Sequence, residues 1–179
     1  EASDLYGTFI ALVFLTLFIG GLVADRYLGY RKSIILGGIM MGIGYFLIGI
    51  HDLTTLYVAM IFIIIGNGFF KPNISTLLGN FYSTPEYKDK KDEGYNIFYM
   101  GINLGAFFSP LVCGSMDFKW GFLAAGVGML LGLVAFILGQ KKYLISEEGK
   151  EIGLPVKKLD AKSIAMIVGS IAIIFFMLN

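Results

Sequence analysis

The sequence predicts an all-α, polytopic transmembrane helical bundle, and three observations carry this prediction. Of its 179 residues, 56% are hydrophobic and 15% are charged, whereas soluble domains carry about 25% charged residues. Six stretches without Asp, Glu, Lys or Arg run for about 17 residues or more, close to the ~20 that a helix needs to cross a bilayer. These stretches do not alternate in polarity as the short strands of a membrane barrel do. We therefore expect five complete helical spans and the start of a sixth.

The uncharged stretches set the expected elements and their order. They cover residues 5–24, 33–50, 53–70, 94–116, 120–140 and 163–179. We expect residues 1–142 to form five transmembrane helices, residues 143–162 to form a cytoplasmic linker, and residues 163–179 to begin a further transmembrane helix.

Loop charges predict the orientation of these helices. Twelve Lys and Arg residues lie in the connections on one side, and only Lys119 lies in those on the other. Because cations collect in cytoplasmic loops, Leu5 is expected outside and residues 141–162 in the cytoplasm, in the plasma (cell inner) membrane. An extracytoplasmic Glu1 without a signal peptide also predicts at least one preceding helix. The sequence is thus interpreted as a fragment.

Composition argues against several classes of protein. The net charge is +1, and no basic cluster is interleaved with aromatic residues, so nucleic acid is not an expected partner. The single Cys113 builds neither a disulfide framework nor a cysteine metal site. One histidine and no carboxylate within the uncharged stretches disfavour a membrane enzyme. We expect no metal and no cofactor, and a channel or structural subunit remains an alternative to a transporter.

Lys71 is the strongest anomaly, because it directly follows the apolar stretch 53–70 and is expected in the middle of one long helix. A lysine deep in hydrocarbon costs about 3 kcal/mol, so such residues usually face a polar cavity or an acidic partner. Pro72 is expected to kink the helix, and Asn73 and Ser75 add polar atoms at the break. These residues predict a binding cavity with a titratable amine. The alternative is that Lys71 snorkels towards the cytoplasmic headgroups.

Three other residues carry polar groups in or next to a span. Asn103 lies in the middle of one, between Gly101 and Gly105, and its amide either joins two helices or contacts a polar ligand. Asp25 and Arg26 lie at the cytoplasmic end of the first span, where they tie neighbouring helices together in one conformation or simply anchor the helix in the positive-inside sense.

Three segments resemble a known family. Residues 20–32, with Asp25-Arg26 and Arg31-Lys32, are similar to the loop between the second and third helices of major facilitator transporters. Residues 66–75 (Gly-Asn-Gly-Phe-Phe-Lys-Pro-Asn-Ile-Ser) and 92–107 resemble signatures of the proton-dependent oligopeptide transporter (POT/PTR) family. The resemblance runs from about Leu5 to Lys142. It implies the second to sixth helices of an incomplete N-terminal half, with residues 163–179 either an inserted helix or the seventh.

The resemblance also implies a function and roles for residues. Family members import di- and tripeptides with protons by alternating access, so the implied partners are a small peptide, protons, the bilayer, the absent first helix and the C-terminal half. Lys71 matches the family's proton-coupling lysine and Asn103 its peptide-contacting asparagine. Phe14 falls where a tyrosine usually lines the site. Transport of nitrate, a drug or another small anion is the alternative within the family.

The remaining implied roles concern gating. Asp25, Arg26 and Arg31 in the cytoplasmic loop, together with Pro72 in the fourth helix of the family, are expected to act in the conformational change. No catalytic residue is expected.

Overall fold

The computed structural model describes residues 2–50, 52–145, 152–154, 165 and 169. Five long helices follow one another, and two short turns of helix join them. Over the described residues the chain contains no β-strand element, so the predicted all-α bundle is confirmed. The helices are α1 (Ala2–Val23), α2 (Tyr30–Ile48), α3 (Leu53–Phe81), α4 (Lys91–Gly114) and α5 (Phe118–Tyr143), with the π-helical turn η1 (Ala24–Leu28) and the 3-10 turn η2 (Lys88–Lys90).

Four of these helices, α2 to α5, are long and apolar enough to cross a membrane, α4 being counted together with η2. α1 has 22 residues and matches the first predicted span. Most of the predicted sixth stretch, 163–179, and most of the predicted linker, 143–162, lie outside the described residues. The predicted division of the chain at these positions therefore stays a prediction.

Local chemistry sets the ends of the helices. α1 runs into η1, and Gly29 at φ 77° then turns the chain into α2. This positive φ is unstrained only for glycine. At the other end of the bundle, Asp52 caps α3 by accepting the backbone N–H of Thr55 at 2.9 Å. That bond holds the pKa of the Asp52 carboxyl below its usual value.

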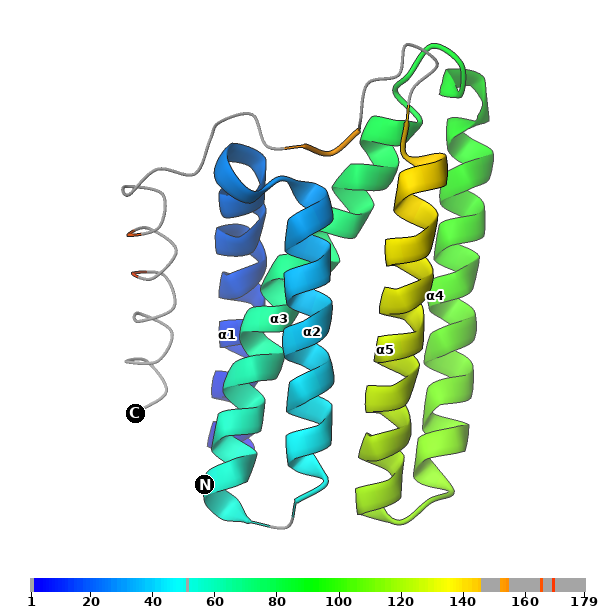
Figure 1. Ribbon diagram of the computed structural model, residues 1–179. Coiled ribbons are helices and arrows are strands. Elements are labelled where there is room, and N and C mark those ends of the chain that lie inside the picture. The colour runs from blue at the N-terminus through cyan, green and yellow to red at the C-terminus, as the bar shows by residue number, and fades with distance from the viewer. Residues whose placement is uncertain (1, 51, 146–151, 155–164, 166–168, 170–179) are drawn as a thin grey trace.

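The helices form an up-and-down bundle and pack in the order α1, α3, α2, α5, α4. α3 packs along both α1 and α2, α2 also packs against α5, and α4 packs mainly on α5. Figure 1 shows the α1–α2 connection, the α3–α4 connection and the end of α5 at one end of the bundle, and the other two turns at the opposite end. The predicted cationic connections around Arg31 and Lys90 thus share one end.

Glycines allow the backbones of α1 and α2 to approach α3 closely. A Cβ atom at Gly20 would lie 2.1 Å from the carbonyl oxygen of Gly68, and one at Gly37 would lie 2.6 Å from that of Gly66. Even a methyl side chain at Gly20 or Gly37 would force the helices apart, so these positions require glycine. Ile64 of α3, which clusters with Leu12 and Val23 of α1, is completely buried.

α4 is packed very differently. Residues 99–112 of α4 are all exposed, and a Cβ atom at Gly101 or Gly105 would meet nothing within 4 Å. Gly128 and Gly132 of α5 also face open space. By contrast, Gly38 and Gly42 of α2 face the side chains of Leu133 and Leu130 in α5.

Candidate functional site

Lys71 lies within one continuous helix, as the sequence predicts. α3 has 29 residues and contains Pro72 in its interior. The side chain of Lys71 is exposed, and it forms no ion pair with any residue that the structure describes. The carboxylates of the described chain lie at helix ends and in loops, at positions such as Asp25, Asp52 and Asp117. An acidic partner for Lys71 must therefore come from outside this part of the chain.

Polar side chains around the Pro72 break bind backbone carbonyls. Asn73 is 1% exposed, and its Nδ2 donates to the carbonyl of Phe69 at 2.8 Å and to that of Gly20 in α1 at 3.4 Å. One turn further on, Thr76 Oγ1 donates to the carbonyl of Pro72 at 2.9 Å. The predicted polar cavity beside Lys71 is therefore not formed by Asn73, whose amide is used within the bundle.

Asn103 and Phe14 come from two other helices. Both side chains are exposed, Phe14 with 66% of its surface. Lys71, Asn103 and Phe14 thus present their side chains from α3, α4 and α1 without a contact among them in the described structure. Such an arrangement offers an ammonium, an amide and an aromatic ring to a ligand or to further helices.

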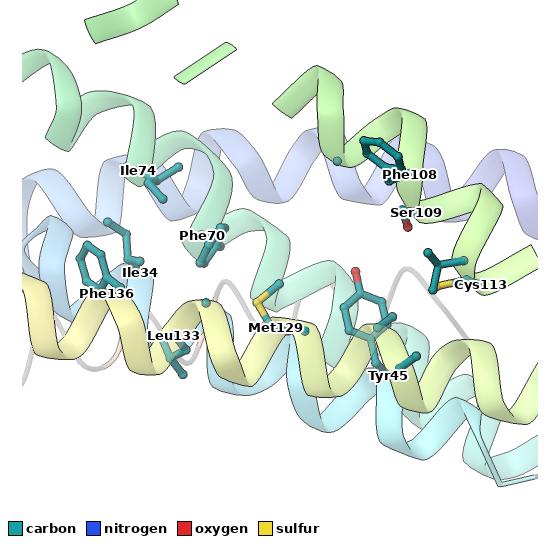
Figure 2. Close-up of a pocket in the computed structure, with 16 residues that line it drawn as sticks. Ile34, Tyr45, Phe70, Ile74, Phe108, Ser109, Cys113, Met129, Leu133 and Phe136 are labelled. Carbon is teal, nitrogen blue, oxygen red and sulfur yellow. The ribbon is translucent and has the colours of Figure 1, made fainter. Parts of the chain in front are cut away.

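A large cavity lies between α2 and α3 on one side and α4 and α5 on the other (Figure 2). It has a volume of about 670 Å³, and neither Lys71 nor Asn103 lines it. Figure 2 shows Phe70 and Ile74 of α3 facing Met129 and Phe136 of α5 across this space. Its lining is apolar apart from Tyr45, Ser109 and Cys113. The cavity suits an apolar side chain or helix face better than a charged peptide.

The turn from α1 into α2, which the sequence predicts to be cytoplasmic, contains three of the four predicted gating residues. The Tyr30 hydroxyl donates to Oδ1 of Asp25, which closes the turn around η1 and Gly29. Asp25 and Arg26 themselves are exposed. Pro72, the fourth predicted gating residue, lies in α3, where its Cβ would be 3.9 Å from a Cβ atom placed on Gly21 of α1.

Arg31 connects this loop to the end of α5, a link that sequence reasoning did not find. Arg31 is 7% exposed. Its Nε donates to the carbonyl of Ile152 at 2.6 Å, and its Nη2 donates to that of Leu144, which follows the last residue of α5. The backbone N–H of Arg31 also donates to the carbonyl of Gly153 at 3.4 Å. No sequence signal announces these bonds, because their acceptors are backbone carbonyls more than 100 residues away.

The fold and the site together define a class of protein: a polytopic membrane bundle of the secondary-transporter type, with a lysine and an asparagine presented within its spans. The family model described as PTR2, POT family, matches residues 31–174. The chain belongs to this family of transporters, and the predicted resemblance is confirmed. It is accordingly part of a multi-pass membrane protein.

Individual relatives agree with this assignment. The chain is 38% identical over 178 residues to the uncharacterized transporter YclF of Bacillus subtilis (strain 168), covering 96% of this chain and 35% of that protein. It is 37% identical over 168 residues to a di-/tripeptide transporter of Lactococcus lactis subsp. cremoris, covering 91% and 33%. The chain thus spans about a third of the length of these relatives.

Solved structures show the same fold. The crystal structure of a peptide transporter POT in complex with sulfate matches with a TM-score of 0.79 and 37% sequence identity, over 95% of this chain and 35% of that one. The arrangement of α1 to α5 is therefore that of a partial major facilitator fold.

Proposed function

We propose that this chain forms part of the N-terminal half of a proton-coupled transporter that imports di- and tripeptides by alternating access. The observation that carries the proposal is an exposed lysine, Lys71, in the interior of a 29-residue apolar helix in a chain of the POT family. An ammonium facing hydrocarbon is costly, so its exposure favours a polar surface opposite it in the complete transporter. The relatives' names support peptide as the substrate.

The proposed mechanism is a competition for the Lys71 ammonium. In the resting state carboxylates from another part of the transporter pair with Lys71. Protonation of these carboxylates removes their charge and frees the ammonium to bind the C-terminal carboxylate of a peptide, an interaction that is strong when both groups are desolvated. Proton release on the cytoplasmic side restores the first pair and expels the peptide. Asn103 contributes an amide that donates to or accepts from the peptide backbone.

The gating residues serve the same cycle in this proposal. The Asp25–Tyr30 bond and the bonds from Arg31 to the end of α5 lie at the cytoplasmic end, where the inward-facing opening forms. Pro72 lets α3 bend between the two states, because its ring removes one backbone hydrogen bond of the helix.

Replacement of Lys71 in the full-length transporter tests the proposal. Proteoliposomes carrying Lys71→Ala and an imposed inward proton gradient should show no gradient-driven uptake of a labelled dipeptide, while counterflow exchange persists with a raised KM, because the peptide carboxylate has lost its ammonium partner. Lys90→Ala, which removes an exposed lysine of the cytoplasmic loop, is the matched control and should transport normally. Undiminished gradient-driven uptake by Lys71→Ala refutes the coupling role.

The substrate is tested separately. Unlabelled di- and tripeptides should compete with the labelled dipeptide for uptake, and nitrate should not. Competition by nitrate alone would replace the peptide assignment with the anion alternative.

A further inference from the structure

The Pro72 break in α3 is fastened to α1 at one point. Proline has no N–H, so the carbonyl four residues earlier, that of Gly68, loses its helical donor. This carbonyl faces the Cα of Gly20 so closely that a Cβ atom there would lie 2.1 Å from its oxygen. The weakened turn of α3 is therefore held directly against the backbone of α1.

Asn73 supplies the directional bonds at this point. Its Nδ2 donates to Phe69 within α3 and to Gly20 across the interface. The two acceptors are both carbonyls, so they require a group with two N–H bonds, which the amide nitrogen provides. Its Oδ1 is buried and accepts no hydrogen bond within the described structure. The amide therefore engages its surroundings through its nitrogen, towards α3 and α1.

Asn73 and Lys71 lie on opposite sides of the helix. Successive residues of an α-helix are rotated by about 100°, so two positions separate these side chains by about 200°. The structure agrees, because Asn73 is buried in the seam with α1 whereas Lys71 is exposed. Fixing the rotation of α3 on the Asn73 side therefore fixes the direction in which the Lys71 ammonium points.

We propose that Asn73 is a positioning residue for Lys71: its amide locks the Pro72 break of α3 onto Gly20 of α1, and this sets the orientation of the coupling lysine. The inference rests on the proposed function for the role of Lys71. Its structural part, that Asn73 sets the orientation of position 71, can be tested without assuming that function. In the transport cycle the lock preserves the orientation of Lys71 while α3 bends at Pro72.

Two substitutions separate the bonds that Asn73 makes. In Asn73→Leu both are lost with little change in volume. In Asn73→Ser the hydroxyl still reaches the carbonyl of Phe69, four residues back, as serine commonly does in helices, and the bond to Gly20 is lost. Ser33→Ala is the matched control, because the Ser33 hydroxyl is buried in α2 and has no hydrogen-bond partner among the residues that the structure describes.

The first measurement does not depend on transport. In full-length protein freed of native cysteines, Lys71→Cys is modified with a charged methanethiosulfonate reagent, alone and combined with each substitution. Losing a bond of about 1 kcal/mol shifts an equilibrium about fivefold, so the modification rate should change about fivefold with Asn73→Leu and Asn73→Ser and stay constant with Ser33→Ala. An unchanged rate with both Asn73 variants overturns the inference.

The second measurement links the lock to coupling, in variants that retain Lys71. Gradient-driven dipeptide uptake should fall about fivefold relative to counterflow exchange in Asn73→Ser. A purely structural role would lower both activities together, in step with the amount of folded protein, and that result would also overturn the inference. If Lys71→Ala transports normally, the proposed function fails, and the modification rates still decide whether Asn73 orients position 71.

Discussion

The packing of α1 on α3 leads to a sharp prediction for two neighbouring glycines. A Cβ atom at Gly20 would lie 2.1 Å from the oxygen and 2.4 Å from the carbon of the Gly68 carbonyl. Both are backbone atoms and cannot rotate away. Ordinary contact begins at 3.4 Å, so α1 and α3 must separate by roughly 1 Å in Gly20→Ala, and overpacking of this kind costs about 1–3 kcal/mol.

Gly21 provides the control on the same helix. A Cβ atom there would lie 3.9 Å from the Cβ of Pro72, an ordinary contact. Gly21→Ala should therefore be neutral or gain up to about 1 kcal/mol from the better helix propensity of alanine.

Thermal stability of the two variants is the test. Full-length protein in detergent is heated in steps, and the fraction that remains monodisperse is measured by size-exclusion chromatography. Gly20→Ala should lower the midpoint by several degrees, whereas Gly21→Ala should leave it unchanged or raise it slightly. Equal midpoints for the two variants would show that α1 does not approach α3 as the structure has it.

Three further predictions concern the surface and the helix ends. Phe14→Tyr adds a hydroxyl at an exposed ring; midpoints of unfolding should not change, and the KM for dipeptide uptake should fall about fivefold if the hydroxyl bonds the substrate. Arg31→Lys cannot bridge the carbonyls of Leu144 and Ile152, so trypsin should cleave the chain after α5 about tenfold faster. The pKa of the Asp52 carboxyl is lowered in the folded state, so its cap stabilises the protein fully at pH values above the unfolded-state pKa of about 4. This stabilisation is lost as the pH falls through the folded-state pKa. The difference in thermal stability between the unsubstituted protein and Asp52→Ala, measured against pH, should therefore vanish below the folded-state pKa.

The helices could be predicted from the sequence because each one is a long uncharged stretch. Lipid requires that every backbone N–H and C=O group form its hydrogen bond within the helix. The length and the lack of charge of a stretch are therefore enough to recognise a membrane-spanning helix. The boundaries are less regular: the uncharged stretch ends at residue 70, whereas α3 continues past Lys71 to Phe81, because one lysine interrupts the charge pattern without ending the helix.

The partners of each side chain could not be predicted in the same way. Asn73 reads as a polar residue beside a binding site, and in the structure it donates to the backbone of two helices. Arg31 reads as a positive-inside anchor, and its guanidinium binds carbonyls more than 100 residues away. In both cases the acceptor is a backbone carbonyl group, which every residue carries, so the sequence does not indicate which residue accepts the hydrogen bond.

The exposed polar residues in the spans lead to one argument about the complete transporter. A helix facing lipid tolerates apolar side chains on every side, and most of α4 is of this kind. It does not tolerate an amide such as that of Asn103 in mid-span without cost, because hydrocarbon offers no partner. Exposing the charged Lys71 of α3 to hydrocarbon costs still more free energy. Since the described residues cover neither side chain, we expect both to face polar surface supplied by the rest of the transporter, and the glycines at 101 and 105, open here, allow that surface to come close to α4.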